Sequence, residues 1–367
     1  MRKSSFDKWL VTLALVAVIA GAVWHFVKSN QAAYDQKQKQ IGTESVSLES
    51  EDFHPYYLPS VPRPTNGPPE REAGFEKLPR AKVEAWLAKH QRDAMSLLAA
   101  FRALDDTNYL NEAATNFPNN PQVELAVLAH DEFPADRRKW LDSFKASSPS
   151  NSLANYLSAQ DYFKNGNTDA AVEELLAATG KSQFENYTVE SELAEEDLAQ
   201  FSGKSPVEAN RMALNDFYGQ VDVSELTTLK QLAQGIEDLQ TQETAAGNTT
   251  SVQNLAQVGM VLGNQLINGG GGNLIINQLV GIADEHIVLA QLDPNTGYDF
   301  LGGETPSQIF QELTKQKKAI TQILQSFDAI RPSMTEDEMV NYSKRMQIYG
   351  EIDAMRWVVQ QHSPAKP

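Results

Sequence analysis

From Arg80 onward, apolar residues recur at intervals of three and four, which is the period of an amphipathic helix. Between Val83 and Leu104 they share one face, and a second long stripe runs from Pro306 to Ile330. Clusters of Asn, Pro and Gly interrupt the pattern, and no run alternates with a period of two. The chain is therefore expected to be an all-α protein.

Capping-box sequences predict where several of these helices begin. In each, a Ser or Thr is followed three residues later by Glu or Gln, so that side chain and backbone satisfy each other at the first turn. The last apolar stripe, from Met339 to Val359, predicts one continuous helix with Arg356 as a surface arginine. The capping-box pairs are Ser205 with Glu208, Thr305 with Gln308, and Thr335 with Glu338.

A different pattern occupies the N-terminus, where an apolar run extends from Trp9 to Val27. A helix of that length spans roughly 28 Å, close to the hydrocarbon thickness of a bilayer. Arg2, Lys3 and Lys8 precede the run, so the N-terminus is expected in the cytoplasm. We therefore expect residues 1–28 to be a transmembrane signal anchor that contacts the membrane through 9–27. The rest of the chain would then be exported, into the periplasm if the cell is Gram-negative.

A cleaved signal peptide is the alternative interpretation of the same segment. Ala20-Gly21-Ala22 has the small-x-small pattern of a signal-peptidase site, and cleavage near Ala22 would release a secreted or periplasmic protein. The apolar run continues through Val23 to Val27, which favours the anchor.

The composition then changes, and this change divides the chain into segments. Residues 29–78 are expected to form a polar stalk and a proline-rich linker, because seven prolines at positions 55–79 favour extended chain. The stretch PYYLPSVPRP is interpreted as spacer, with a partner-binding motif as the alternative. Helical hairpins are expected at 79–186, a C-terminal helical bundle at 187–362 and a short tail at 363–367.

One helical hairpin, at 152–183, has small and large residues at a recognisable spacing. The small side chains allow two antiparallel helices to approach closely, a glycine lets the chain turn, and the large side chains fill the remaining space. The positions concerned are Ala159, Tyr162, Gly166, Ala171, Leu175 and Ala178.

This spacing resembles that of a tetratricopeptide repeat, and weaker matches extend the resemblance over residues 105–183. The sequence departs from the repeat where Asn155 and Ser158 replace Trp and Leu, and where Gln183 replaces Pro. The resemblance implies a concave surface that binds a protein or peptide. An ordinary helical hairpin is the alternative.

The C-terminal half contains no such repeat, but it does contain a glycine tract at 269–272 between two apolar stretches. Asn and Gln recur in both stretches, so we expect a buried helical hairpin and not a membrane hairpin. Gly259 and Gly263 are four residues apart and predict close helix packing. No Gly-Lys-Ser/Thr follows the tract, which excludes a phosphate-binding loop.

Charge and composition argue against several classes of function. The formal net charge is −17, which disfavours nucleic acid as a partner. There are no cysteines, which excludes disulfides, thiolate metal sites and cysteine nucleophiles.

Candidate chemistry is sparse. We interpret 130–132 (HDE) and 284–286 (DEH) as solvated helix ends, and 173–174 and 195–197 as solvated acidic faces. No catalytic motif, metal-ligand spacing or cofactor motif occurs. We therefore expect a non-catalytic scaffold or protein-interaction module on the outer side of the cytoplasmic membrane. An exported enzyme with an unrecognised carboxylate site is the alternative.

Overall fold

The structure is a computed structural model that describes residues 78–220, 223–269 and 274–363, with the backbone alone at 214–220 and 223–225. The predicted signal anchor, nearly all of the linker and most of the tail lie outside these residues. Glu76–Pro367 form one compact unit. None of the helices in the described ranges combines the length and the apolar character that a membrane span requires.

The all-α prediction is confirmed for the part of the chain that the structure describes. Every regular element there is a helix, and the only sheet-like pairing is an isolated bridge between Asn151 and Gln183.

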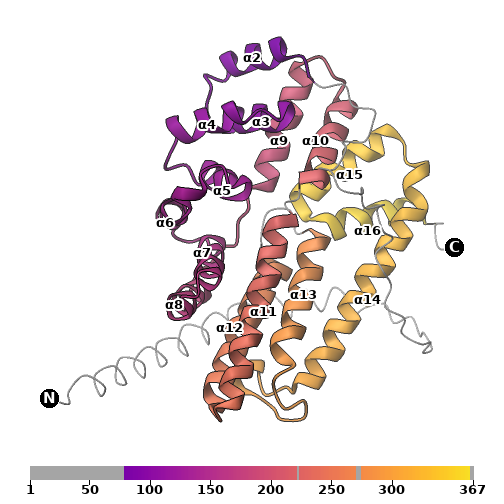
Figure 1. Cartoon of the computed structure of the whole chain (residues 1–367). Coiled ribbons are helices and arrows are strands. Elements are labelled where there is room, and N and C mark those ends of the chain that lie inside the picture. The colour runs from indigo at the N-terminus through magenta and orange to yellow at the C-terminus, as the bar shows by residue number, and fades with distance from the viewer. Residues whose placement is uncertain (1–77, 221–222, 270–273, 364–367) are drawn as a thin grey trace, which may run out of the picture. The chain divides into compact units, whose positions relative to one another are not determined.

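Helices α2 to α8 form the first group, and each of them packs on the next helix in the chain (Figure 1). α5 and α6 are separated by a short 3-10 turn, η1 (Pro134–Asp136). The helices are α2 (Arg80–Lys89), α3 (Ala94–Leu104), α4 (Thr107–Asn116), α5 (Pro121–His130), α6 (Arg137–Ser147), α7 (Leu153–Lys164) and α8 (Thr168–Thr179).

The second group lies against the first. α9 packs on α10 and on α2 and α3, while α11 packs on α7 and α12 packs on α8. α11, α12 and α13 lie side by side and contact one another pairwise (Figure 1). The helices are α9 (Thr188–Phe201), α10 (Pro206–Gln220), α11 (Val223–Ala245), α12 (Thr249–Asn268) and α13 (Ile275–Leu289).

The last group contains α14 (Pro306–Ile330), α15 (Glu336–Tyr349) and α16 (Glu351–His362), with the 3-10 turns η2 (Asp299–Leu301) and η3 (Arg331–Ser333). α16 packs on α14 and α15, and α15 packs on α10. The prediction of one continuous last helix is wrong. Gly350, with φ 88° and ψ 165°, separates α15 from α16, a backbone conformation that glycine adopts without steric cost.

The predicted helix starts are confirmed. Both reciprocal hydrogen bonds of the capping box are present at Thr305 and at Thr335. At the start of α10, the Ser205 N–H donates to Glu208 at 3.0 Å and the Glu208 N–H donates to Ser205 at 3.2 Å. Local sequence therefore supplies capping hydrogen bonds at these helix starts.

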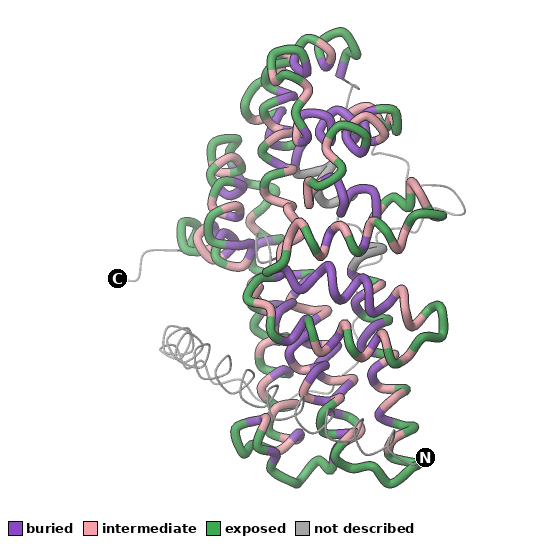
Figure 2. Tube along the Cα trace, turned by 90° about the vertical axis from the view of Figure 1, so that its left-hand side faces the viewer, coloured by how far each residue is buried: buried purple, intermediate pink, exposed green. Residues whose placement is uncertain are grey.

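Burial follows the inner faces of the helices (Figure 2). The largest apolar cluster joins α5 to α8 with α11, α12 and α13, so it includes residues from both predicted segments, 79–186 and 187–362. A second cluster joins α2 to α5 with α9, and a third joins α13 to α16.

Candidate functional site

The predicted repeat-like hairpin corresponds to α7 and α8. Ala159, Ala171 and Ala178 are fully buried, and Leu175 is also buried. Gly166 lies in the turn with φ +71°, where a larger side chain would be strained. The two helices pack against each other along their length, as the spacing predicts.

Tyr162, the remaining predicted position, is only partly buried. The guanidinium carbon of Arg138, on α6, lies 4.4 Å from the centre of its ring. This cation–π contact holds α6 against α7. Tyr162 therefore packs under a charged side chain and not in the apolar core.

The departures from the repeat pattern at Asn155 and Ser158 have a physical cause. Asn155 Nδ2 donates to Glu174 at 2.7 Å, and Ser158 Oγ donates to Glu174 at 2.8 Å. Lys145 of α6 forms an ion pair with the same carboxylate. The prediction of a solvated face is therefore wrong for Glu174, whose side chain is 12% exposed, whereas Glu173 is exposed.

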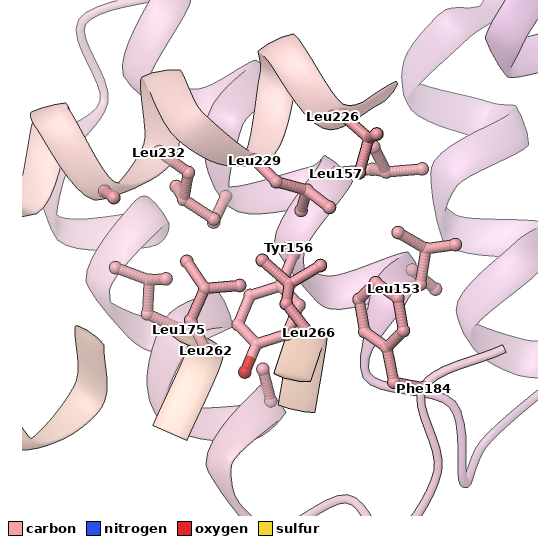
Figure 3. Packing of buried hydrophobic residues seen from close by; sticks show 14 of the residues in the cluster. Leu153, Tyr156, Leu157, Leu175, Phe184, Leu226, Leu229, Leu232, Leu262 and Leu266 are labelled. Atoms are coloured by element: carbon pink, nitrogen blue, oxygen red, sulfur yellow. The ribbon is translucent and has the colours of Figure 1, made fainter. Parts of the chain in front are cut away.

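The opposite face of α7 is covered by the chain's own helices. The buried Tyr156 hydroxyl donates to Gln265 Oε1 of α12 at 2.7 Å, and Gln160 Nε2 donates to Gln231 of α11 at 3.3 Å. Figure 3 shows Tyr156 surrounded by leucines of α8, α11 and α12. This face is therefore closed to a partner in the structure described.

A second polar feature is a pair of buried acids on α13. Asp284 is 0% exposed, and neither of its carboxylate oxygens has a hydrogen-bond partner. Glu285 is 5% exposed. Burial raises the pKa of Asp284 to about 8, and burial together with the neighbouring Asp284 raises the pKa of Glu285 to about 8. The prediction of a solvated helix end at 284–286 is wrong, because α13 continues to Leu289 and turns these acids inward.

His286, the third residue of that sequence motif, faces away from the acids. Its ring stacks on Phe310 of α14 with the centroids 4.7 Å apart and the planes nearly parallel. Burial lowers its pKa, and Lys317 lowers it further. The histidine therefore packs as a neutral aromatic ring. At 130–132, by contrast, His130 and Asp131 are exposed at the end of α5, as predicted.

Glycines bring the backbones of α12 and α13 into direct contact, so the predicted close packing at Gly259 and Gly263 is confirmed. A Cβ atom on Gly259 would lie 2.8 Å from the Cβ atom of Val288. A Cβ atom on Gly263 would lie 2.9 Å from the carbonyl oxygen of Gly281, and it would also meet the side chain of Glu285.

A buried polar network connects α9, α10 and α15. Ser343 donates to Glu192 at 3.2 Å, and Asn210 donates to Ser343 at 2.7 Å. Burial raises the pKa of Glu192 to about 7. On the next turn of α9, Glu195 pairs with Arg102 at 3.3 Å and is 8% exposed. The predicted solvated face at 195–197 is therefore wrong for Glu195.

The end of α15 exposes large apolar side chains. Ile348 is 71% exposed and Tyr349 is 56% exposed. The guanidinium carbon of Arg345 lies 5.4 Å from the ring centre of Tyr349 and 5.0 Å from that of Trp357 on α16. We call these four residues the α15 surface. The sequence placed Tyr349 in an apolar stripe, but the structure leaves it exposed at the end of α15, directly before Gly350.

Among the residues that the structure describes, no group of three or more His, Cys, Asp or Glu could hold a metal ion. A comparison with known protein families, curated proteins and solved structures finds no significant match.

Proposed function

We propose that this protein is a non-catalytic interaction or scaffold protein of the cell envelope. In this proposal the segment 9–27 anchors the chain in the cytoplasmic membrane, and the proline-rich linker displays the helical unit on the outer side. The observation that carries the interaction role is the α15 surface, where Ile348 and Tyr349 are 71% and 56% exposed.

The composition of the α15 surface is that of a binding hot spot. Tyrosine, tryptophan and arginine are enriched in the energetically important centres of protein interfaces. Arg345 is already held by Tyr349 and Trp357, so less side-chain entropy is lost when a partner binds. Covering a side chain such as Ile348 contributes up to about 1.5–3 kcal/mol, which favours a partner that buries it.

The repeat-like hairpins have a different role in this proposal. Since α11 and α12 cover the inner face of α7, a partner would meet the outer faces of α6 and α8. These helices carry the ion-paired cluster around Glu174, which fixes their relative position. We therefore assign them a supporting role and assign partner binding to the α15 surface.

The test is co-purification of partners from a detergent extract, using the full-length protein and identification by mass spectrometry. The double variant Ile348→Gln and Tyr349→Gln should lose partners that the wild-type protein retains. Phe201→Gln is the matched control, because Phe201 is another exposed apolar residue, at 36%, and lies beside Lys89 of α2. Equal recovery of every partner by the double variant would refute the role of the α15 surface.

The alternative, an exported enzyme, has one observation in its favour. Buried carboxyl groups with a raised pKa, such as Asp284 and Glu285, are common at catalytic sites. Against it, Asp284 is 0% exposed, so a substrate does not reach it in this conformation. An Asp284→Asn variant that keeps its partners but loses the cellular function would favour the enzyme.

A further inference from the structure

The buried carboxyl group of Asp284 is an unusual element of the α12–α13 hairpin. Both oxygens lack a hydrogen-bond partner. On α13, Val280 and Ile287 flank this position, and both pack against the apolar cluster that contains α7 and α11. An ionised carboxylate at this place would have neither water nor a donor to stabilise it, so the closed packing requires the neutral acid.

Glu285 is constrained in a similar way on the adjacent face of α13. Its side chain packs directly on Gly263, where the helices approach so closely that no added Cβ atom would fit. Glu285 is 5% exposed, so its carboxyl group meets little water while the two helices stay packed. Ionisation of Glu285 is therefore coupled to the separation of α13 from α12.

The charged groups around the pair do not compensate for ionisation. α12 contains no Asp, Glu, Lys or Arg. From α11, Lys230 favours the ionised form of Asp284, but it is exposed, and Glu237 contacts Gln291. On α14, Lys317 acts on the neighbouring His286, and from α16 the Glu351 carboxylate accepts the N–H of Ile275. The two acids therefore face a nearly uncharged interior.

We propose that the α12–α13 hairpin is a pH-sensitive latch, which stays closed while Asp284 and Glu285 are neutral and loosens when they ionise. Closed, the hairpin covers the inner face of α7 through the Tyr156–Gln265 hydrogen bond and the surrounding apolar cluster. Loosening weakens the part of this cover that α12 provides, while α11 still packs on α7. The latch does not involve the α15 surface, so a test of the latch is separate from a test of the proposed partner site.

The sign of the pH effect follows from the two states of each carboxyl group. In the open hairpin the groups titrate near about pH 4, as exposed acids do. In the closed hairpin their pKa is about 8. The closed form is therefore fully favoured below about pH 4 and loses stability until about pH 8, by up to tenfold per pH unit for each carboxyl group.

Hydrogen exchange of the full-length protein in detergent, followed by mass spectrometry and corrected for intrinsic rates, tests the latch. Protection of α12 and α13 amides should fall by about tenfold or more per unit between about pH 6 and about pH 8. The double variant Asp284→Asn and Glu285→Gln should show no such fall. Each single variant should remove about half of the slope, which keeps the test decisive if the double variant does not fold.

Glu192→Gln is the matched control, because Glu192 is also a buried acid with a raised pKa but lies on α9. It should leave the response of α13 unchanged. Protection of α13 that does not change with pH in the wild-type protein would overturn the latch. So would a slope that is the same in the wild-type protein and in both single variants.

Discussion

Replacing Gly281 by alanine tests the backbone contact between α12 and α13. A Cβ atom there would lie 2.5 Å from the carbonyl oxygen of Gly263 and 2.8 Å from Ile267 Cγ1. The carbonyl belongs to the backbone of α12, so it can move only if the whole helix shifts. The substitution therefore has to push α12 and α13 apart.

The magnitude follows from two opposing effects. Overpacking a tight contact costs about 1–3 kcal/mol, whereas exchanging glycine for alanine inside a helix gains about 1 kcal/mol. We therefore expect Gly281→Ala to lower the free energy of unfolding by up to about 2 kcal/mol. Gly235→Ala is the control, because its Cβ would lie 3.4 Å from the Phe163 ring, an ordinary contact. This control should raise the free energy of unfolding by about 0.5–1 kcal/mol.

The assay is denaturant unfolding of residues 76–367, which form one compact unit, followed by circular dichroism. The two substitutions are chemically identical and both lie inside helices, so only the packing distinguishes them. Stabilisation of similar size by both would show that α12 and α13 are not in backbone contact, and the argument for the latch would fail with it.

The remaining predictions concern the repeat-like hairpin and the buried acids, all measured by the same unfolding assay. Ala159→Leu should lower the free energy of unfolding by about 1–3 kcal/mol, while exposed Lys164→Ala should change it by less than about 0.5 kcal/mol; equal effects would contradict the packing of α7 on α8. Tyr156→Phe should lower it by about 1–2 kcal/mol because Gln265 loses its buried partner, and no change would indicate that water replaces the hydroxyl. Because burial raises the pKa of Asp284 to about 8, the free energy of unfolding should fall between about pH 5 and about pH 8, and Asp284→Asn should reduce that slope.

The sequence predicted well what depends on local interactions. The helical period gave the fold class, and the capping boxes marked the starts of α10, α14 and α15. The spacing of Gly259 and Gly263 predicted the close contact of α12 and α13, because only glycine leaves room for another backbone. The signal anchor and the linker remain predictions.

The sequence-based predictions that are wrong share a different cause, namely tertiary contacts that the local sequence does not show. Asp284, Glu285 and Glu195 were interpreted as solvated because charged residues usually are, yet neighbouring helices bury them. The break at Gly350 depends on one glycine inside an otherwise continuous apolar stripe. α11 and α12, which cover α7, are distant from it in the chain. Gln160 and Gln231, which hydrogen-bond to each other, are 71 residues apart.

The resemblance to a tetratricopeptide repeat remains a hypothesis about the origin of α7 and α8. The small residues lie where that repeat would place them, and all of these alanines are buried. Asn155 and Ser158, which stand where that repeat would have large apolar residues, hydrogen-bond to Glu174. A helical hairpin of independent origin would satisfy the same packing requirements.

Site-specific photo-crosslinking in living cells tests the proposed function most directly. A photoreactive amino acid would replace Tyr349, which is 56% exposed on the α15 surface. The control position is Lys315 on α14, whose side chain is 74% exposed and pairs with Glu312. The account predicts a discrete crosslinked protein partner at position 349 and none at position 315. No adduct at position 349, or the same adducts at both positions, would contradict it.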